Sequence, residues 1–241
     1  LSGLVGSEMC IRDSYHNCNH LIGNTKNICD YIIGAGWPAE NCHYLPNFVN
    51  ATLGKPIDRS IFNTPNDAPL LLAMGRLHEN KAFDGLLDAI ACVPGCYLWI
   101  AGDGPLHQSL FEQSKQLGVK SRTRLLGWRQ DTANLLATCD IFLCPSRHEP
   151  LGNVVIEAWA QHKPVIAAAA QGPTSLITPS LNGLLFPIDD ARAASNAILQ
   201  VMASEDLRTT LAENGFNTYQ EYFTEARVVA LYQEFFEMVK K

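Results

Sequence analysis

The sequence lacks any long hydrophobic run. Its longest clean apolar stretches, "PLLLAM" and "VIAAAA", have the length of strands, and neither approaches the roughly 18 apolar residues that a membrane-spanning helix requires. With 47% hydrophobic residues among 241, the chain still has enough apolar material for a full core and for one large or two small domains. We therefore expect a globular protein without a transmembrane segment.

Clusters of positive charge are also missing. Lys and Arg number 18 against 24 Asp and Glu, which leaves a formal net charge of -6 at pH 7. A nucleic-acid-binding domain needs a basic patch to neutralise phosphates. The composition therefore predicts that nucleic acid is not a partner.

Cysteine pairs with metal-binding or redox spacing are absent. The eight cysteines form no CxxC motif, and the nearest pairs, Cys92/Cys96 and Cys139/Cys144, have no His or Cys partners at zinc spacing. The cysteines thus show no zinc-binding pattern. We expect the cysteines to be buried free thiols, which suits a protein of the reducing cytoplasm.

The first residues need separate treatment. Residues 1–14, "LSGLVGSEMCIRDS", have no basic region before their short apolar part, so they do not match a signal peptide. The string resembles translated adaptor sequence of the kind that contaminates gene fragments assembled from environmental DNA. We expect a disordered, non-native leader here.

Residues 15–49 predict a strand, a helix and a second strand, with Thr25 as the helix cap and with Ile28 and Ile32 facing inward. This piece is too small for an independent domain, so we expect the remnant of a larger N-terminal domain. Residues 50–69 contain three prolines and no sustained periodicity, which indicates a linker.

Residues 70–222 alternate between short apolar runs and segments with helical spacing. The runs are "LLLAM", "YLWIA", "RLL", "IFLC", "VIAAA" and "LLF". Short continuous apolar strands are typical of a parallel sheet that helices cover on both faces. The pattern predicts one α/β domain with a doubly wound parallel sheet, followed by an amphipathic C-terminal helix at residues 223–241.

The loop after the first of these strands, "GRLHENKAFDG", carries Arg76 and Lys81 on the way into a helix. Two cations beside a helix N-terminus suit a diphosphate, because backbone N–H groups and the helix dipole also favour an anion there. Solvated surface charges are the simpler interpretation of each residue taken alone.

Two further loops offer weaker signals. "GDGP" has no third glycine at dinucleotide-binding spacing, so we interpret it as a tight turn in which Asp103 caps the following helix and Pro105 lies in its first turn. A ligand can still lie above that turn. The "GW" after the third strand can offer backbone groups to a planar base.

The stretch "SRHEPLGNVVIEA" places two glutamates around a Pro-Gly turn, directly after an apolar strand. If a helix starts near Gly152, Asn153 and Glu157 share one of its faces, and Glu149 lies in the loop above. The N–H groups of Gly152 and Asn153 can bind a phosphate, and ionised carboxylates accept hydrogen bonds from hydroxyls. A ligand with both groups is a sugar nucleotide. A solvated helix face is the simpler interpretation of Glu157 alone.

At this point the sequence resembles a known family. "GRLHENKAF", "IAGDGP", "LLGW", "CPSRHEPLGNVVIEAWAQHKPVIA" and "NGLLFP" occur in the order found in retaining glycosyltransferases of the GT-B fold, family 4, in which the two glutamates form the E-x7-E motif. The resemblance covers residues 15 to about 190. It implies that residues 70–222 are the second, Rossmann-like domain of such an enzyme, which binds a nucleotide-activated sugar as donor substrate and needs no separate cofactor and no metal.

The resemblance also implies a role for each candidate residue. Arg76 and Lys81 would hold the donor diphosphate, Gly152 and Asn153 its distal phosphate, and Glu157 the ribose. Glu149 would be the catalytic residue that binds the hydroxyls of the donor sugar. A glycan or lipid-linked acceptor would bind through the missing N-terminal domain, so we expect a cytoplasmic or membrane-peripheral enzyme of which this chain supplies the donor-binding, inactive half.

The sequence departs from the family pattern at two positions. Ala82 stands where the family often has glycine, and Ser175 lies near a position that usually carries a glutamate. Two alternatives stay open on the sequence: a non-catalytic nucleotide-binding module, and a GT-B-like nucleotide-sugar epimerase, which should carry further acid/base residues near the sugar.

Overall fold

A computed structural model describes residues 17–49 and 52–240, so the expected leader at residues 1–14 lies outside the described residues. Phe48–Arg227 forms one compact unit, and the described residues up to Asn47 form a second unit together with the described residues from Val228 onward. In the described part of the chain, no helix is long and apolar enough to cross a membrane.

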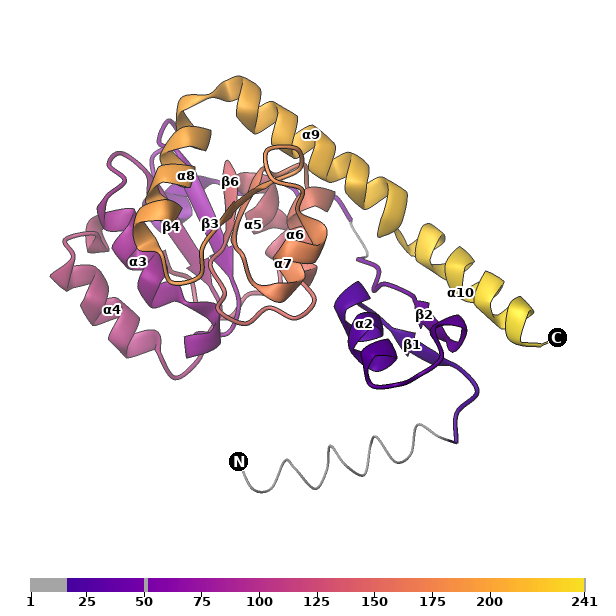
Figure 1. The fold of residues 1–241 in the computed structure, drawn as a ribbon. Helices are drawn as coiled ribbons and strands as arrows, with labels where there is room; N and C mark the ends of the chain where they lie inside the picture. Colours follow the sequence, from indigo (N-terminus) through magenta and orange to yellow (C-terminus); the bar gives the residue numbers. More distant parts are fainter. Residues whose placement is uncertain (1–16, 50–51, 241) are drawn as a thin grey trace, which may run out of the picture. The chain divides into compact units, whose positions relative to one another are not determined.

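The larger unit is built on a parallel sheet with the strand order β5-β4-β3-β6-β7-β8 (Figure 1). Its strands are β3 (Leu70–Met74), β4 (Tyr97–Ala101), β5 (Thr123–Leu125), β6 (Ile141–Cys144), β7 (Val165–Ala168) and β8 (Leu184–Phe186). Each strand lies within one residue of the apolar run that predicted it. The predicted doubly wound α/β sheet is confirmed.

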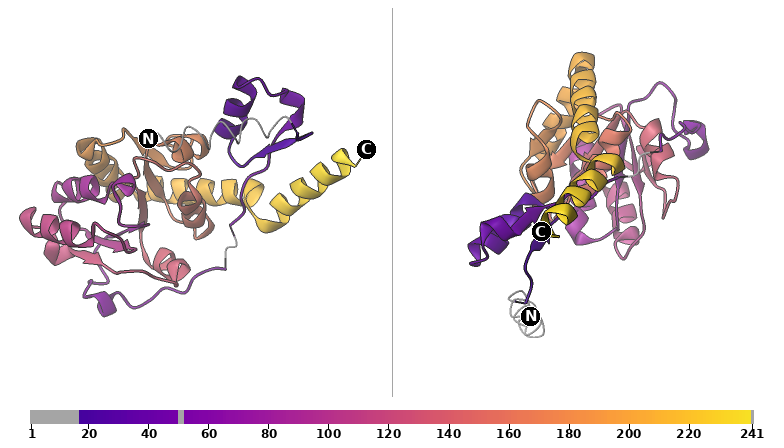
Figure 2. Two further views of the ribbon diagram at one scale, coloured as in Figure 1. Left: turned by 90° about the horizontal axis from the view of Figure 1, so that it is seen from below. Right: turned by 90° about the vertical axis from the view of Figure 1, so that its right-hand side faces the viewer.

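Helices cover both faces of this sheet, as the two further views in Figure 2 show. One face packs against α3, α4 and α8, and the other against α5, α6 and the end of α9. The helices of the unit are α3 (Phe83–Ala91), α4 (His107–Gln116), α5 (Thr132–Thr138), α6 (Asn153–Ala160), α7 (Gln171–Leu176), α8 (Ala191–Ala203) and α9 (Glu205–Tyr222). Short 3-10 helices are η2 (Arg59–Phe62), η3 (Glu79–Lys81) and η4 (Lys120–Arg122).

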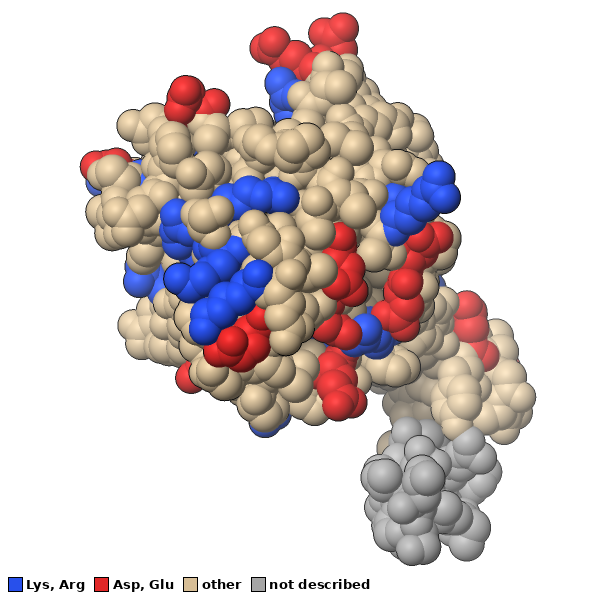
Figure 3. Space-filling view, turned by 90° about the vertical axis from the view of Figure 1, so that its left-hand side faces the viewer, with Lys and Arg blue, Asp and Glu red and all other residues tan. Residues whose placement is uncertain are grey.

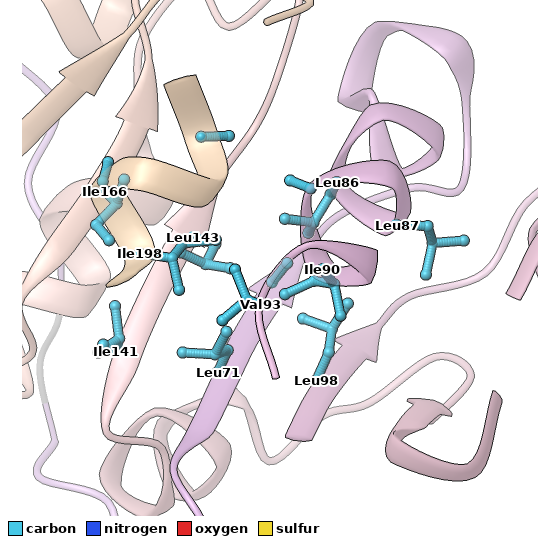
Figure 4. Close-up of a cluster of buried hydrophobic side chains, with 14 of the residues drawn as sticks. Leu71, Leu86, Leu87, Ile90, Val93, Leu98, Ile141, Leu143, Ile166 and Ile198 are labelled. Carbon is cyan, nitrogen blue, oxygen red and sulfur yellow. The ribbon is translucent and has the colours of Figure 1, made fainter. Parts of the chain in front are cut away.

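The core divides between the two faces because successive strand residues point in opposite directions. Leu71 packs with Leu98, Leu143 and Ile90 of α3 on one face, where the side chains interdigitate as Figure 4 shows. Leu72 contributes to the cluster on the other face. Strands that are buried on both faces explain why the sequence shows continuous apolar runs instead of alternation.

Helix α6 is fixed from behind by α9. Gly215 of α9 faces the Trp159 indole, and a Cβ added at Gly215 would overlap the ring. Trp159 is fully buried, and its Nε1 donates to the carbonyl oxygen of Asn182 at 2.9 Å. Because α6 is held on this side, its opposite face presents residues at a defined position.

Residues 52–57, which lie in the expected linker, pack onto the larger unit. The backbone N–H of Gly54 donates to the Gln161 side chain at 2.8 Å, and the N–H of Ile57 donates to Thr138 Oγ1 at 2.9 Å. The side chains of Thr138 in α5 and of Gln161 just after α6 thus satisfy backbone groups that an irregular segment cannot pair internally.

The smaller unit contains β1 (Leu21–Gly23), α2 (Lys26–Gly34), η1 (Ala39–Asn41) and β2 (Cys42–Tyr44), and β1 pairs with β2 in parallel. Its C-terminal part belongs to α10 (Glu225–Val239). Thr25 caps α2 as predicted, because its Oγ1 accepts from the N–H of Ile28 at 3.1 Å. The expected inward face was half wrong: Ile32 is buried, but Ile28 is 36% exposed and Cys29 takes the inner position one residue later.

The prediction of buried cysteines was also partly wrong. Of the described cysteines, all of them free, Cys29, Cys96, Cys139 and Cys144 are buried, whereas Cys18 and Cys92 are exposed. Cys92 is exposed because it follows the last turn of α3 and lies outside the apolar stripe of that helix.

Candidate functional site

The strand order reverses at the pair β3 and β6, since the chain proceeds from β3 to β4 and β5 on one side and from β6 to β7 and β8 on the other. The two strands run parallel, with Leu72 opposite Phe142, so the loops that follow them leave the same edge side by side. Ligands of open α/β sheets bind at such a switch point. The sequence motifs with Lys81 and Glu149 follow these two strands.

The Glu149 loop owes its shape to two glycines. Gly152 is the N-terminal cap of α6 and has φ of 75°, a conformation that glycine adopts without strain. A Cβ at Gly172 would lie 2.5 Å from the carbonyl oxygen of Glu149, while the Gly172 N–H donates to that oxygen at 2.7 Å. The loop before α7 therefore packs directly against the backbone of the Glu149 loop. The expected helix start near Gly152 agrees with the structure.

Lys81 and Glu149 meet across the switch point. Lys81 Nζ lies 2.5 Å from Glu149 Oε2, and Ser146 Oγ donates to the same oxygen at 3.3 Å. Glu149 is only 8% exposed, and Lys81 is its ion-pair partner. The methylene groups of Lys81 lie against Gly75, where a Cβ would come within 3.3 Å of them. The structure thus brings together two residues that the sequence assigned to different parts of one ligand.

Arg76 is the second predicted cation of the loop after β3. It is exposed, and its guanidinium forms no hydrogen bond or ion pair with any residue in the described part of the chain. The structure therefore does not join Arg76 to Lys81 or Glu149, although all three belong to the loops at the switch point. An exposed arginine with free donors is able to bind a phosphate.

Asn153 and Glu157 of α6 line a pocket of about 290 Å³ to which α5 also contributes. Thr132 and Ala133 at the start of α5 and Phe48 also line this pocket. The N–H groups of Gly152 and Asn153 donate to no residue among those described, so they remain available at the start of α6. The pocket thus combines the amide of Asn153 and the carboxylate of Glu157 with partly apolar walls.

Glu157 carries an unusual charge environment. Burial raises the pKa of its carboxyl, and the negative charge of Glu149 raises it further. Within the described chain, no hydrogen bond or ion pair reaches this carboxylate. A carboxylate kept without a partner beside a pocket is poised to accept hydrogen bonds from a ligand.

This environment predicts that Glu157→Gln stabilises the protein at pH 7. A raised pKa in the folded state means that stability falls as the pH rises from the unfolded value of about 4.3 through the folded pKa. Glutamine removes the penalty, so we expect a gain of roughly 1 kcal/mol at pH 7. That gain corresponds to an increase of about 2–4 °C in the melting temperature.

Melting curves of the two proteins between pH 3.5 and 8 measure the effect, and the difference should vanish below about pH 4. Glu213→Gln on the exposed side of α9 is the matched control and should show no such pH-dependent gain. A Glu157→Gln variant that is less stable than the parent at pH 7 would contradict this account.

The loops after β3, β4 and β5 meet through glycine backbone. Gly102 has φ of 148°, its N–H donates to the Gly127 carbonyl oxygen at 2.8 Å, and a Cβ at Gly102 would overlap the carbonyl oxygen of Gly75. Trp128 follows Gly127 and is 68% exposed.

The expectation that Asp103 caps α4 was wrong: α4 begins at His107, and Asp103 Oδ1 instead accepts from the Gly104 N–H at 2.7 Å. The N–H of Leu106, the residue before α4, donates to the Leu77 carbonyl oxygen, so the chain at Leu106 is bonded to the loop after β3 and α4 begins only at His107.

Two residues of this edge escaped the sequence analysis. Ser146 contacts Glu149, and Arg147 forms ion pairs with Asp84 at 2.8 Å and Asp189 at 2.6 Å. The position of Arg147 next to the glutamate motif is a local signal, but its partners lie far away in the sequence.

On the face drawn in Figure 3, basic and acidic side chains lie in adjacent groups, so this face carries both signs of charge. No group of three or more His, Cys, Asp or Glu in the described part could hold a metal ion.

Comparison with known proteins places this geometry in a family. The lipopolysaccharide core biosynthesis glycosyltransferase LpsE of Rhizobium meliloti (strain 1021) is 38% identical over 218 residues, which cover 90% of this chain and 64% of LpsE. LpsD of the same strain is 32% identical over 223 residues, which cover 92% of this chain and 65% of LpsD. The chain thus spans slightly less than two thirds of the length of these relatives.

A solved structure, that of HepE (Alr3699) from Anabaena in complex with UDP and glucose, matches with a TM-score of 0.84 and 25% sequence identity. The match covers 97% of this chain and 66% of HepE. The fold is therefore that of the Rossmann-like domain of GT-B glycosyltransferases. The family model of glycosyl transferases group 1 matches residues 54–218, which is most of the chain. This chain belongs to the glycosyl transferases group 1 family.

Proposed function

We propose that this chain supplies the donor-binding domain of a retaining glycosyltransferase of family 4, which transfers a sugar from a nucleoside diphosphate to an acceptor hydroxyl. The observation that carries the proposal is the Lys81–Glu149 pair at the switch point, where a cation suited to a diphosphate lies beside a buried carboxylate suited to sugar hydroxyls. The family match and the UDP and glucose in the HepE complex support it.

In this proposal Arg76 and Lys81 bind the diphosphate. Lys81 lies next to the edge of the sheet as a point charge, and the exposed guanidinium of Arg76 closes over the phosphates from solvent. The N–H groups of Gly152 and Asn153 bind the distal phosphate at the start of α6, where the helix dipole favours an anion. These groups stabilise the diphosphate as it leaves with negative charge.

Glu149 accepts hydrogen bonds from hydroxyls of the donor sugar, and Glu157 accepts them from the ribose. When the diphosphate takes Lys81 as its partner, the Glu149 carboxylate becomes available to the sugar. Glu157, which has no partner among the described residues, needs no such exchange. The pocket beside Asn153 and Glu157 then holds the nucleoside.

The acceptor is proposed to be a lipid-linked glycan, because LpsE and LpsD are named for lipopolysaccharide core biosynthesis. Such a substrate places the enzyme in the cytoplasm at the periphery of a membrane. The part that binds the acceptor would belong to an N-terminal domain of which residues 15–49 are a remnant. Two domains together would deliver the acceptor hydroxyl to the anomeric carbon.

Calorimetric titration of the 241-residue chain with UDP, GDP and ADP, and with the corresponding monophosphates, tests the donor site. We expect the preferred diphosphate to bind at least about tenfold more tightly than its monophosphate, because each charged hydrogen bond to the added phosphate contributes about 1.5–3 kcal/mol. Equal affinities for a diphosphate and its monophosphate, or no binding of any nucleotide, would refute the proposed donor site.

A further inference from the structure

Arg147 connects three loops at the carboxyl edge of the sheet. Its Nη1 and Nη2 donate to the Asp84 carboxylate at 3.0 and 2.8 Å, and its Nε donates to Asp189 Oδ1 at 2.6 Å. Nη1 also donates to the carbonyl oxygen of Glu79 at 2.7 Å. Asp84 lies in the first turn of α3 and Asp189 lies just before α8. One side chain therefore ties together the loops after β3, β6 and β8.

The environment of Arg147 argues against a role as a phosphate ligand. Two carboxylates surround one guanidinium, and all three of its nitrogens already donate to protein oxygens. Hydrogen bonds to Asp84, and then to Asp189, raise the pKa of Arg147 despite partial burial. Burial alone would raise the pKa of Asp84, but the hydrogen bonds and charge of Arg147, with backbone N–H donors, lower it. The positive charge of this guanidinium is balanced by two carboxylates, so it has little attraction left for a ligand anion. Its effect is on the segments that it joins.

Those neighbours are the proposed donor residues. Arg147 is two positions before Glu149, and its acceptors Glu79 and Asp84 flank Lys81 in the sequence. Between them, the N–H of His148 donates to the Asn80 carbonyl oxygen at 3.2 Å. The bonds of Arg147 thus join the segment that carries Glu149 to the segment that carries Lys81, at a place next to the Lys81–Glu149 pair.

Donor binding would break that pair, since the phosphates attract Lys81 and the sugar hydroxyls occupy Glu149. The bonds of Arg147 involve neither of these side chains, so they persist through the exchange. We propose that Arg147 is a positioning residue that fixes the Glu149 carboxylate for the donor sugar while Lys81 and Glu149 change partners. This role rests on the proposed function, because it assumes that Glu149 binds the sugar.

Asp189 offers a graded way to loosen the connection. It is a non-glycine residue with φ of 60°, a left-handed conformation that Asp and Asn adopt more readily than most residues. Asp189→Asn therefore keeps the backbone while it removes one of the two charges that hold Arg147. Arg147→Ala removes the whole connection.

Affinities of the 241-residue chain for UDP and UDP-glucose, measured by calorimetry, test the role. We expect Arg147→Ala to change the UDP affinity less than about threefold, but to reduce the affinity for UDP-glucose relative to UDP by about tenfold, the equivalent of one misplaced charged hydrogen bond. Asp189→Asn should reduce this relative affinity in the same direction and by less. Because Arg147 acts through Glu149, Arg147→Ala in a Glu149→Gln background should cause no further reduction.

Arg122→Ala is the matched control, since Arg122 also joins separate segments by donating to the carbonyl oxygens of Ile90 and Val93. Arg122 ends η4, just before β5, and so lies at the opposite edge of the sheet from the proposed donor residues. It should lower the melting temperature and leave the relative affinity unchanged. If the parent chain binds UDP and UDP-glucose but Arg147→Ala and Asp189→Asn keep the parental ratio, or if the losses add to that of Glu149→Gln, the positioning role is wrong. If the parent chain prefers GDP or ADP, the same comparison is made with that diphosphate and its glucose conjugate. A parent chain that binds none of these compounds would instead overturn the donor site itself, and the role of Arg147 with it.

Discussion

Replacing Arg76 and Lys81 together by alanine is expected to abolish measurable binding of nucleoside diphosphates. Each residue would lose charged hydrogen bonds to the phosphates, at about 1.5–3 kcal/mol each, so the affinity should fall by about 100-fold to 10,000-fold. Lys81→Ala also leaves the buried Glu149 carboxylate without its ammonium partner, and the remaining negative charge repels the ligand. Calorimetric titration with UDP, GDP and ADP measures the loss.

The control for this experiment is the double variant Lys115→Ala, Lys120→Ala, which changes the net charge by the same amount. Lys115 lies in the last turn of α4 and Lys120 in η4, just before β5, so both are remote from the carboxyl edge of the sheet. This variant should bind the nucleotide as the parent does. If the Arg76 and Lys81 variant also keeps the parental affinity while remaining folded, the two residues do not belong to the donor site.

The second large effect concerns the transfer reaction. We expect the 241-residue chain to bind a sugar nucleotide and transfer no sugar, and we expect a protein extended at its N-terminus to the full length of its relatives to transfer it. In that longer protein, Glu149→Gln should lower the rate by about 100-fold or more, because it removes a preorganised charge next to the reacting sugar. It should weaken nucleotide binding much less.

Glu157→Gln is the counterpart in the same protein. It should weaken donor binding by about tenfold and change the rate at saturation little, because the ribose is remote from the bond that breaks. The same substitution should still stabilise the fold at pH 7, so its effect on binding cannot be attributed to unfolding. Transfer by the 241-residue chain alone, or equal rate and binding losses for the two variants, would contradict this division of roles.

The strands of this protein were readable from the sequence because a doubly covered parallel sheet leaves apolar runs such as "LLLAM" and "IFLC" with turns between them. The cap at Thr25 and the start of α6 followed from local chemistry in the same way. That Asp103 does not cap α4 could not be predicted from its neighbours in the sequence. The backbone hydrogen bond from Leu106 to Leu77, a contact between distant segments, accompanies the later start of the helix.

The proposed donor residues were individually visible in the sequence, but their arrangement was not. Nothing in the spacing of Lys81 and Glu149 indicates that they pair, because the order of β3 and β6 in the sheet decides it. The role of Arg147 was missed for the same reason: its partner Asp84 lies far before it in the sequence and its partner Asp189 far after it. Sequence patterns identify residues that follow a strand, whereas the strand order determines which of those residues meet.

The contact between Gly102 and the backbone of Gly75 has a consequence for engineering the donor preference. Any side chain at Gly102 would overlap a carbonyl oxygen, so a saturation library that includes this position would consist mainly of misfolded variants. Trp128, on the loop after β5, is exposed and has room for other side chains. A search for altered nucleotide selectivity should therefore diversify Trp128 and leave Gly75 and Gly102 unchanged.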